Sequence, residues 1–369
     1  MLGSTGSIGR STLDVLRRQR DHFEVVALTC GRNREEFRRQ VAEWRPAFAG
    51  LAVPGTDDHW PCGPEVLVEA ATRPDVDIVV NAVVGAVGLD ATLAALRAGK
   101  RVALANKESL VMAGDLVVQA ACAGGGEIVP VDSEHSAVLQ CVAGRDAGLG
   151  RLILTCSGGP FREWPHERIR EATVEEALRH PTWRMGQKIT VDSATLANKA
   201  LEVIEAHYLF RLSYDALEVV VHPQSIIHAF VEFCDGSVIA QLGFPSMELP
   251  ILYALTHPGR LPDTGVRRLD PVAAGPFTFE PVRRDVFRAL DAGMAAGRAA
   301  GTAPAVFNAA NEVAVAAFLD GAIPFGRISE IIERVLEAHA PAAATAVEAV
   351  READRWARAR ARELVRSQC

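Results

Sequence analysis

Short apolar segments alternate with helical patterns over the first 130 residues. Apolar runs of strand character cover residues 23–29, 77–82, 101–105 and 126–130. Residues 88–96 show the periodicity of an amphipathic helix, and Gly99 follows as its stop signal. Such alternation predicts a doubly wound parallel sheet. We therefore expect an α/β fold that begins with a Rossmann-like, nucleotide-binding domain over residues 1–130.

The pattern changes after Gly150. Strand patterns recur at residues 151–155, 219–223, 229–233 and 237–242, which predicts a central α+β catalytic domain over residues 131–255. Residues 256–284 are rich in Pro, Gly and Arg and are predicted to be a linker.

Helical periodicity dominates the C-terminal part of the chain, residues 285–369. The predicted helices are residues 285–299, 305–319, 329–338 and 346–366, which predicts a helical bundle. Thr345 and Glu348 have the spacing of a capping box at the start of the last helix. The polar stretch at residues 308–312 is predicted to make a packing or interdomain contact.

Two acidic residues follow the apolar run that ends at Pro130. Asp132 and Glu134 are two positions apart, which in an extended chain places both carboxylates on the same side. Ligands bind at the carboxyl ends of strands in open α/β sheets, and paired carboxylates suit Mg²⁺ or Mn²⁺. A polar loop after a strand is the alternative, but Glu202 offers a third carboxylate and favours the metal site.

The chain opens on three glycines, Gly3, Gly6 and Gly9, followed by a helical pattern. A glycine-rich turn into a helix N-terminus cradles a pyrophosphate on backbone N–H groups. The strand predicted over residues 23–29 is followed by Arg32. NAD-binding sites usually carry an acidic residue after this strand, and that residue binds the ribose hydroxyls. A guanidinium suits a 2′-phosphate, so we predict NADP(H) as the cofactor. A surface arginine after a strand is the alternative.

A polar cluster lies near the start of the helix predicted over residues 194–210. Ser193 is predicted to be its N-cap. Asn198, Lys199 and Glu202 share one helix face, and Lys199 is one of only four lysines among 39 basic residues. These groups together suit a phosphate and a metal ion, whereas a solvated polar face is the alternative.

Three further segments carry candidate chemistry. Lys107 follows a strand and suits an anionic substrate oxygen, with a solvated loop cation as the alternative. Ser157 lies in a Gly-rich turn that would expose its hydroxyl. Residues 180–186 place Trp183 and Met185 beside Pro and Gly, which predicts a lid, and an ordinary loop is the alternative.

Composition limits the partners and the compartment. A net charge of −7 without a basic block gives no indication of nucleic acid or of an anionic membrane. No apolar run approaches the roughly 20 residues that span a bilayer, and no signal-peptide pattern is present. Seven cysteines without CxxC spacing indicate free thiols in a reducing cytoplasm.

These segments together resemble the 1-deoxy-D-xylulose 5-phosphate reductoisomerase family over nearly the whole chain. The resembling segments are residues 3–9, 105–110, 130–135, 157–161, 188–195, 198–202, 222–225, 241–243 and 308–312. The resemblance implies an enzyme that rearranges and reduces 1-deoxy-D-xylulose 5-phosphate to 2-C-methyl-D-erythritol 4-phosphate in the non-mevalonate isoprenoid pathway. It implies NADPH and a divalent cation (Mn²⁺, Mg²⁺ or Co²⁺) as cofactors, and a homodimer in the bacterial cytoplasm.

The resemblance also assigns roles to residues. NADPH would be bound by Thr5, Gly6, Ser7, Ile8, Gly31, Arg32, Asn33, Asn106, Glu108 and Gly186. The divalent cation would be held by Asp132, Glu134 and Glu202, which would be catalytic together with Lys107 and His180. The phosphorylated sugar would contact Lys107, Ser133, Glu134, Ser157, His180, Ser193, Asn198, Lys199 and Glu202. Trp183 and Met185 would belong to a flap.

Two positions depart from the family's pattern. Ala200 stands where the family usually has Gly, and Ser246 where it usually has Asp. Neither is an assigned ligand, so the departures concern local packing or partner contacts. Only two residues precede Gly3, whereas the strand before such a turn usually has about five. We therefore expect the natural chain to begin several residues upstream.

Two other functions fit parts of the pattern. A metal-free NADP-dependent reductase would share the nucleotide-binding turn, and an NADPH-sensing regulator would bind the nucleotide without turnover. Metal-dependent turnover of the sugar phosphate would separate both from the reductoisomerase.

Overall fold

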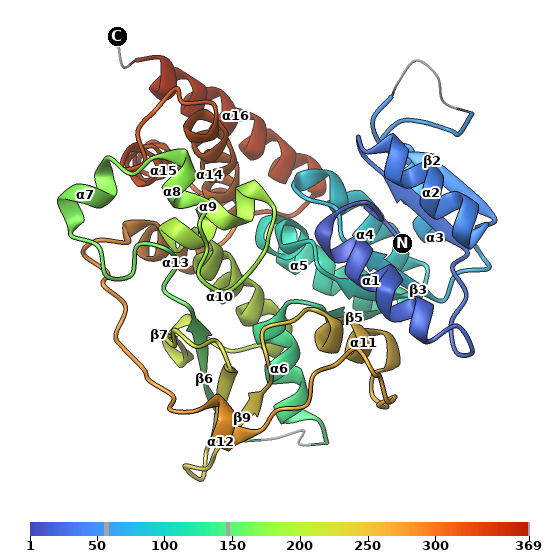
Figure 1. Ribbon diagram of the computed structural model, residues 1–369. Helices are drawn as coiled ribbons and strands as arrows, with labels where there is room; N and C mark the ends of the chain where they lie inside the picture. Colours follow the sequence, from blue (N-terminus) through green and yellow to red (C-terminus); the bar gives the residue numbers. More distant parts are fainter. Residues whose placement is uncertain (55–58, 145–147, 368–369) are drawn as a thin grey trace. The chain divides into compact units, whose positions relative to one another are not determined.

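The computed structural model describes residues 1–54, 59–144 and 148–367, and the chain divides into two compact units (Figure 1). Unit 1 comprises Met1–Ser109, Asp115–Ala143 and Ser246–Arg268. Unit 2 comprises Leu110–Gly114, Gly144–Pro245 and Leu269–Cys369. The domain boundaries predicted at residues 130, 255 and 284 stay a prediction.

The sheet of unit 1 is parallel. Its strands are β1 (Ala27–Cys30), β2 (Phe48–Leu51), β3 (Ile78–Asn81), β4 (Arg101–Leu104) and β5 (Glu127–Pro130). β1 pairs with β2, and β4 pairs with both β3 and β5. Leu2 makes parallel bridges to Thr29 and to Asn81, so one residue joins the two groups in the order β2, β1, Leu2, β3, β4, β5. This arrangement confirms the predicted doubly wound sheet.

Helices cover the sheet of unit 1 because they bury apolar faces against it. The helices are α1 (Ser7–Arg18), α2 (Arg34–Trp44), α3 (Glu65–Thr72), η1 (Ala86–Gly88), α4 (Leu89–Arg97), α5 (Lys107–Gly124), α6 (Ser133–Val142) and α11 (Glu248–Thr256). Leu13 of α1 and Ile251 of α11 share one hydrophobic core with Leu28, Val80 and Val129 of the strands. Burial of this apolar surface explains why residues 246–268 belong to unit 1 despite their distance in sequence.

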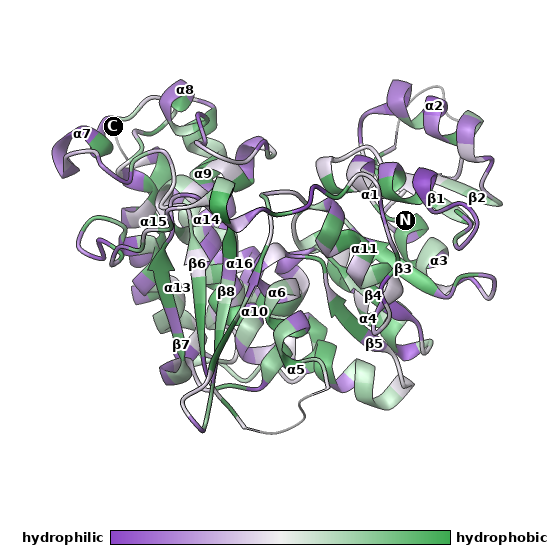
Figure 2. Cartoon of the chain, turned by 60° about the horizontal axis from the view of Figure 1, so that its bottom comes forward, coloured by the Kyte–Doolittle hydropathy of each residue, from purple (hydrophilic) through white to green (hydrophobic). Residues whose placement is uncertain are grey.

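Unit 2 is built on a mixed sheet. Its strands are β6 (Leu149–Cys156), β7 (Leu217–Val221), β8 (Ile227–Phe233) and β9 (Val238–Leu242), in the order β7-β6-β8-β9. β6 pairs with β7 in parallel, whereas β8 is antiparallel to both β6 and β9. Figure 2 shows that hydrophobic residues dominate β6 and β8 at the middle of this sheet. The four predicted strands are thus confirmed, with shifted ends.

The helices of unit 2 form two groups. Before the C-terminal region lie α7 (His166–Arg170), α8 (Val174–Ala177), α9 (Gln187–Thr195), α10 (Ala197–Phe210) and η2 (Tyr214–Ala216). Later in the chain come α12 (Pro271–Ala274), α13 (Arg288–Ala299), α14 (Ala303–Leu319), α15 (Arg327–Glu337) and α16 (Val347–Arg366). α14 packs against α15 and α16, and α13 packs against α10, which confirms the predicted C-terminal helices as a packed group.

Three local predictions were wrong. The chain after β5 is not extended, because Asp132 caps helix α6 and Glu134 lies in its first turn. Ser193 is not an N-cap: it lies inside α9, and α10 starts beyond Leu196, which has a positive φ of 61°. The capping box at Thr345 does not form, since the N-cap of α16 is Ala346 and no side chain caps it.

Among the residues that the structure describes, no helix combines the length and apolarity needed to cross a bilayer.

Candidate functional site

The glycine-rich turn of unit 1 places the start of α1 where an anion could bind. Gly3 has a φ of 79°, and a Cβ there would lie 2.7 Å from the carbonyl oxygen of Ala82. A Cβ on Gly9 would lie 2.4 Å from the carbonyl oxygens of both Gly3 and Ser4. α1 has Gly6 as its N-cap, with no side-chain cap and no acidic residue in the first turn. The positive end of α1 is thus left without a built-in anion, which fits a pyrophosphate.

The end of β1 supplies the second part of a nucleotide site. Gly31 follows β1, and a Cβ there would meet nothing within 4 Å. Arg32 is exposed, and Asn33 caps α2 by accepting a hydrogen bond from the N–H of Glu36. Arg32 therefore stands between the end of β1 and a fixed helix start, with its guanidinium open to a ligand.

The side-chain amide of Asn106 makes hydrogen bonds within unit 1 through both its nitrogen and its oxygen. Its amide nitrogen donates to the carbonyl oxygens of Val83 and Gly85 at 2.9 and 3.0 Å and also contacts Glu108. Its oxygen accepts from the N–H of Ser109 as the cap of α5. These contacts use the whole amide, so Asn106 acts on this site by shaping the loop after β3.

The candidate metal ligands come from two helix starts. Asp132 Oδ1 accepts a hydrogen bond from the N–H of Glu134 at 3.3 Å, and Lys107 Nζ pairs with the other oxygen of Asp132. The hydroxyl of Ser133 donates to Glu134 at 2.5 Å. Glu202 lies on α10 with 1% of its surface exposed and is contacted by Asn198 and by Lys199.

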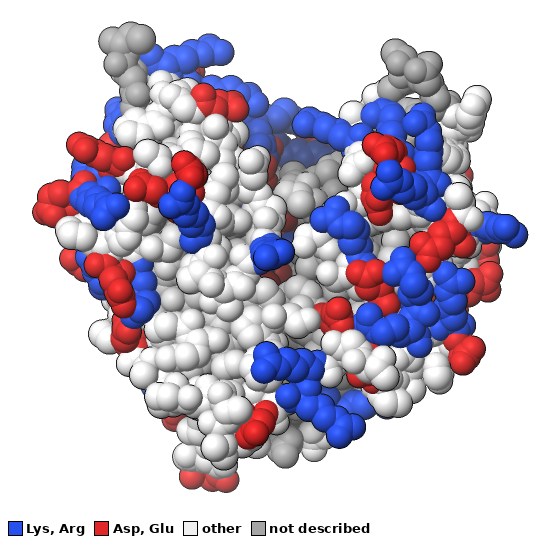
Figure 3. Space-filling model, in the orientation of Figure 1, with Lys and Arg blue, Asp and Glu red and all other residues white. Residues whose placement is uncertain are grey.

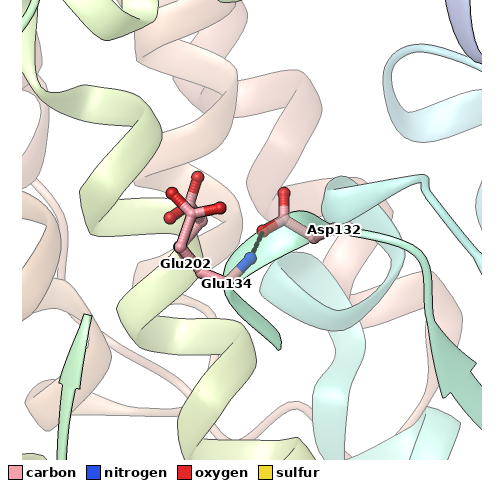
Figure 4. Close-up of side chains that lie close together, drawn as sticks. All are labelled: Asp132, Glu134 and Glu202. Atoms are coloured by element: carbon pink, nitrogen blue, oxygen red, sulfur yellow. Dashed lines mark hydrogen bonds between the residues drawn. The ribbon is translucent and has the colours of Figure 1, made fainter. Parts of the chain in front are cut away.

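Asp132, Glu134 and Glu202 form a group that could hold a metal ion. One carboxylate oxygen from each lies within 4.8 Å of the others, and Figure 4 shows the three side chains with the Asp132–Glu134 hydrogen bond. Carboxylate oxygens are hard donors of the kind that Mg²⁺ and Mn²⁺ prefer. Without an ion, Lys107 and Lys199 balance part of this negative charge. The donor set therefore fits a divalent cation.

Two serine hydroxyls and one imidazole meet in unit 2. His180 Nε2 lies 3.1 Å from the Oγ of Ser157 and 3.1 Å from the Oγ of Ser193. Its Nδ1 accepts hydrogen bonds from the N–H groups of Thr182 and Trp183 at 3.1 and 2.9 Å. Because Nδ1 is an acceptor, the neutral ring carries its proton on Nε2, between the two hydroxyls. Burial lowers the pKa of His180 from 6.5 to about 4, so this neutral form prevails near pH 7.

The turn after β6 fits closely against the end of α9. Gly158 and Gly159 have positive φ values of 82° and 70°, which only glycine adopts readily. A Cβ on Gly159 would lie 2.8 Å from the carbonyl oxygen of Ser193. The N–H of Gly159 donates to Ser157 Oγ at 3.2 Å. Hydroxyls and a backbone N–H thus gather around His180, as expected for a phosphate pocket.

Asn198 and Lys199, the other predicted phosphate ligands, contact Glu202 in this structure. Lys199 is only 2% exposed, and its ammonium group pairs with Glu202 within one turn of α10. The alternative of a solvated helix face therefore does not hold for Lys199 and Glu202, which are buried. A bound cation would compete with Lys199 for the same carboxylate.

The predicted flap forms neither helix nor strand between residues 180 and 186. Trp183 is half-buried, and its ring centroid lies 6.4 Å from that of His228. Met185 is half-buried as well, and exposed Gly186 is the N-cap of α9. Since His180 Nδ1 binds the backbone at Thr182 and Trp183, the flap is tied directly to the pocket of Ser157 and Ser193.

Sequence reasoning assigned no role to the buried ion pair on α9. Lys188 Nζ lies 2.8 Å from an oxygen of Asp192, which is 1% exposed. The signal was present in the sequence, since Lys188 is one of the four lysines and Asp192 follows it at i+4.

Surface charges on unit 1 are locally paired. On the face seen in Figure 3, basic and acidic side chains are interspersed. Within unit 1, Arg17 pairs with Glu43 at 2.8 Å and Arg18 with Asp263 at 2.6 Å. Arg17 and Arg18 at the end of α1 are thus part of ion pairs within the unit.

Comparison with known proteins shows which family the chain is similar to. A family model described as 1-deoxy-D-xylulose 5-phosphate reductoisomerase matches residues 1–114, and two models of the C-terminal domain of that enzyme match residues 128–210 and 242–360. The reductoisomerase of Heliobacterium modesticaldum is 50% identical over 99% of this chain and 96% of its own length. That of Geobacillus kaustophilus is 50% identical over 99% of this chain and 98% of its own length.

Solved structures agree as well. The reductoisomerase of Zymomonas mobilis in complex with NADPH is 42% identical, with a TM-score of 0.90 over 99% of this chain and 97% of that one. A reductoisomerase in complex with NADPH, fosmidomycin and magnesium is 38% identical, with a TM-score of 0.92 and the same coverage. With half of its residues identical to named relatives over almost its full length, the chain belongs to the 1-deoxy-D-xylulose 5-phosphate reductoisomerase family.

Proposed function

We propose that this chain converts 1-deoxy-D-xylulose 5-phosphate to 2-C-methyl-D-erythritol 4-phosphate with NADPH and a divalent cation, in the non-mevalonate isoprenoid pathway. The chain is an NADPH-dependent oxidoreductase of that family. The observation that carries the proposal is the combination of a nucleotide-binding turn with three carboxylates in a full-length relative of these enzymes. A metal-free reductase would have no use for Asp132, Glu134 and Glu202 together.

NADPH is assigned to unit 1. The start of α1 at Thr5, Gly6, Ser7 and Ile8 would hold the pyrophosphate, since glycine lets the phosphate approach the backbone there. Gly31, Arg32 and Asn33 would hold the adenosine 2′-phosphate, with the Arg32 guanidinium as the charged contact. Asn106 and Glu108 would shape the loop beside the cofactor, and Gly186 would reach it from the flap. The bound cofactor would supply the hydride.

The divalent cation is assigned to Asp132, Glu134 and Glu202. A cation bound there would act as a Lewis acid toward substrate oxygens. Lys107 and Lys199, which now pair with Asp132 and Glu202, would lose part of that attraction and turn toward the anionic substrate. Ser133, hydrogen-bonded to Glu134, would hold this carboxylate in place and face the substrate.

The substrate phosphate is assigned to Ser157, His180, Ser193, Asn198 and Lys199. The neutral His180 would donate its Nε2 proton, and the serine hydroxyls would donate theirs. Because His180 also accepts from the flap backbone, phosphate binding would draw the flap with Trp183 and Met185 over the reacting carbons. Closure would exclude water from the site and use the binding energy of the phosphate for catalysis.

One assay tests the proposal against its alternatives. Oxidation of NADPH is followed at 340 nm (the reduced nicotinamide band) with 1-deoxy-D-xylulose 5-phosphate, with and without EDTA. We expect turnover that EDTA abolishes and Mn²⁺ or Mg²⁺ restores. Turnover that EDTA leaves unchanged would favour a metal-free reductase, and NADPH binding without turnover would favour a sensing regulator.

The assembly and the compartment follow from the family resemblance. We propose a homodimer in the bacterial cytoplasm, without nucleic acid or membrane partners. Native mass spectrometry of the purified chain would show twice the 39.6 kDa monomer mass, and a monomer at micromolar concentration would contradict it.

A further inference from the structure

Two asparagines on α14 are fully buried, yet the proposed chemistry uses neither. Asn308 and Asn311 each have 0% of their surface exposed. Buried amides require hydrogen-bond partners, and these two find different ones. Asn308 Nδ2 donates to Glu312 Oε1 at 3.0 Å on its own helix. Asn311 Nδ2 donates to Asp192 Oδ1 at 2.8 Å, on α9.

Asp192 is held from two sides. Lys188 of α9 pairs with its Oδ2 at 2.8 Å, and Asn311 of α14 donates to its Oδ1. A buried carboxylate is costly unless charge and hydrogen bonds compensate it. The side chain of Asp192 therefore points toward α14, and this fixes the rotation of α9 about its own axis.

The next residue on α9 is Ser193, whose hydroxyl lies 3.1 Å from His180 Nε2. Adjacent side chains on a helix differ in direction by about 100°, so a fixed Asp192 also fixes the direction of Ser193. The carbonyl of Ser193 packs against Gly159 of the turn that carries Ser157. A small rotation of α9 would thus disturb both serines around His180.

We infer that Asn311 is a positioning residue for the substrate phosphate: through Asp192 it orients Ser193, and Ser193 in turn holds His180. The C-terminal helices thereby take part in substrate binding without touching the substrate. The role in phosphate binding rests on the proposed function, whereas the orientation of Ser193 and His180 does not.

The test compares Asn311→Ala with Asn308→Ala. Both variants remove a buried amide from the same helix, but only the first removes the bond to Asp192. We expect Asn311→Ala to raise the KM for 1-deoxy-D-xylulose 5-phosphate by roughly tenfold, the size of one lost hydrogen bond to a charged group. The kcat and the Kd for NADPH should stay within about twofold. Asn308→Ala should leave all three constants near wild type, even if its Tm falls equally.

A second measurement is independent of turnover. In protein labelled with ¹³C-histidine, the His180 signal is identified from its loss in His180→Gln. It should shift in Asn311→Ala and not in Asn308→Ala. If Asn311→Ala fails to fold, Asn311→Leu keeps the branched shape of the side chain without its hydrogen bond and carries the same expectations. A folded Asn311 variant with the KM of the wild type and an unshifted His180 signal would overturn the inference. A wild-type protein without turnover would instead remove the proposed function, and the His180 signal would still decide the orientation.

Discussion

His180 joins the flap to the two serines through opposite nitrogens of one ring. Its Nδ1 accepts from backbone N–H groups and its Nε2 faces Ser157 and Ser193. Protonation would place a proton on Nδ1, where two donors already point. The geometry and the burial therefore both favour the neutral ring.

The titration of His180 is the first prediction. Its pKa is lowered from 6.5 to about 4 by burial, so between these values the unfolded chain binds a proton that the folded chain does not. Stability should therefore fall as the pH drops through this window. NMR of ¹³C-labelled histidine should show His180 titrating near pH 4, and the Tm of His180→Gln should depend less on pH than that of the wild type. A His180 signal that titrates near pH 6.5 would contradict this.

Glu202→Gln tests the metal site. The change keeps the shape of the side chain but removes a charged ligand. Loss of a residue that merely hydrogen-bonds to a ligand already weakens metal binding by roughly tenfold or more, so the affinity for Mn²⁺ should fall at least as much. NADPH binding should stay unchanged, because the cofactor is assigned to unit 1. Isothermal titration calorimetry measures the affinity for Mn²⁺, and the fluorescence of NADPH measures the affinity for the cofactor.

Glu205→Gln is the matched control for Glu202→Gln. Glu205 is also buried on α10, with 3% of its surface exposed, but does not belong to the carboxylate group. Equal losses of Mn²⁺ affinity in both variants would mean that general damage to α10, rather than a lost ligand, causes the effect.

At the scale of elements, we expect the start of α2 to determine whether the protein prefers NADPH or NADH. Arg32 precedes a capped helix start and is exposed. Arg32→Asp places a carboxylate beside the 2′-phosphate, so the Kd for NADPH should rise by roughly tenfold or more, and that for NADH much less. Arg38→Asp makes the same charge change on the exposed side of α2 and should affect neither. Parallel losses for both nucleotides would show that Arg32 does not contact that phosphate.

The flap is the element most open to direct observation. Trp183 reports on its surroundings by fluorescence, and exposed Arg184 offers trypsin a cleavage site in a segment without helix or strand. NADPH, Mn²⁺ and a phosphonate analogue of the substrate together should change the fluorescence of Trp183 and protect the bond after Arg184. Arg184→Gln should resist this cleavage even without ligands, which would show that trypsin cuts after Arg184. Cleavage at the same rate with and without ligands would show that the flap does not close.

At the scale of the whole molecule, different segments of the chain should respond to different ligands. Ligands lower the local opening of the segments that bind them. In hydrogen exchange, NADPH should therefore protect the starts of α1 and α2, whereas Mn²⁺ with a phosphonate analogue of the substrate should protect residues 187–199. Protection of residues 187–199 by NADPH alone would contradict the assignment of these residues to the substrate phosphate and the metal.

The sequence by itself determined the parallel class of the sheet in unit 1, the strands of the sheet in unit 2 and most of the candidate residues. Alternating apolar and helical periods predict βα repeats, because a parallel strand needs a crossover helix. The spacing of Gly3, Gly6 and Gly9 ahead of a helical pattern is visible in the sequence, and a Cβ on Gly3 or Gly9 would clash with backbone atoms. Asp132, Glu134, Lys107 and Ser157 were found from residue type and position after a strand. Lys199 and Glu202 were found from their shared face on a predicted helix.

Only the tertiary structure decided what each polar side chain faces. Local pattern favoured an extended chain at Asp132 and an N-cap at Ser193, but packing drew both into helix starts or interiors. The burial of Lys199 and Glu202 was not predicted, since a polar helix face is usually solvated. The bond from Asn311 to Asp192 joins residues 119 positions apart, and no local period encodes such a contact. Short-range patterns fix the elements, whereas hydrogen-bond partners across the chain depend on how those elements pack.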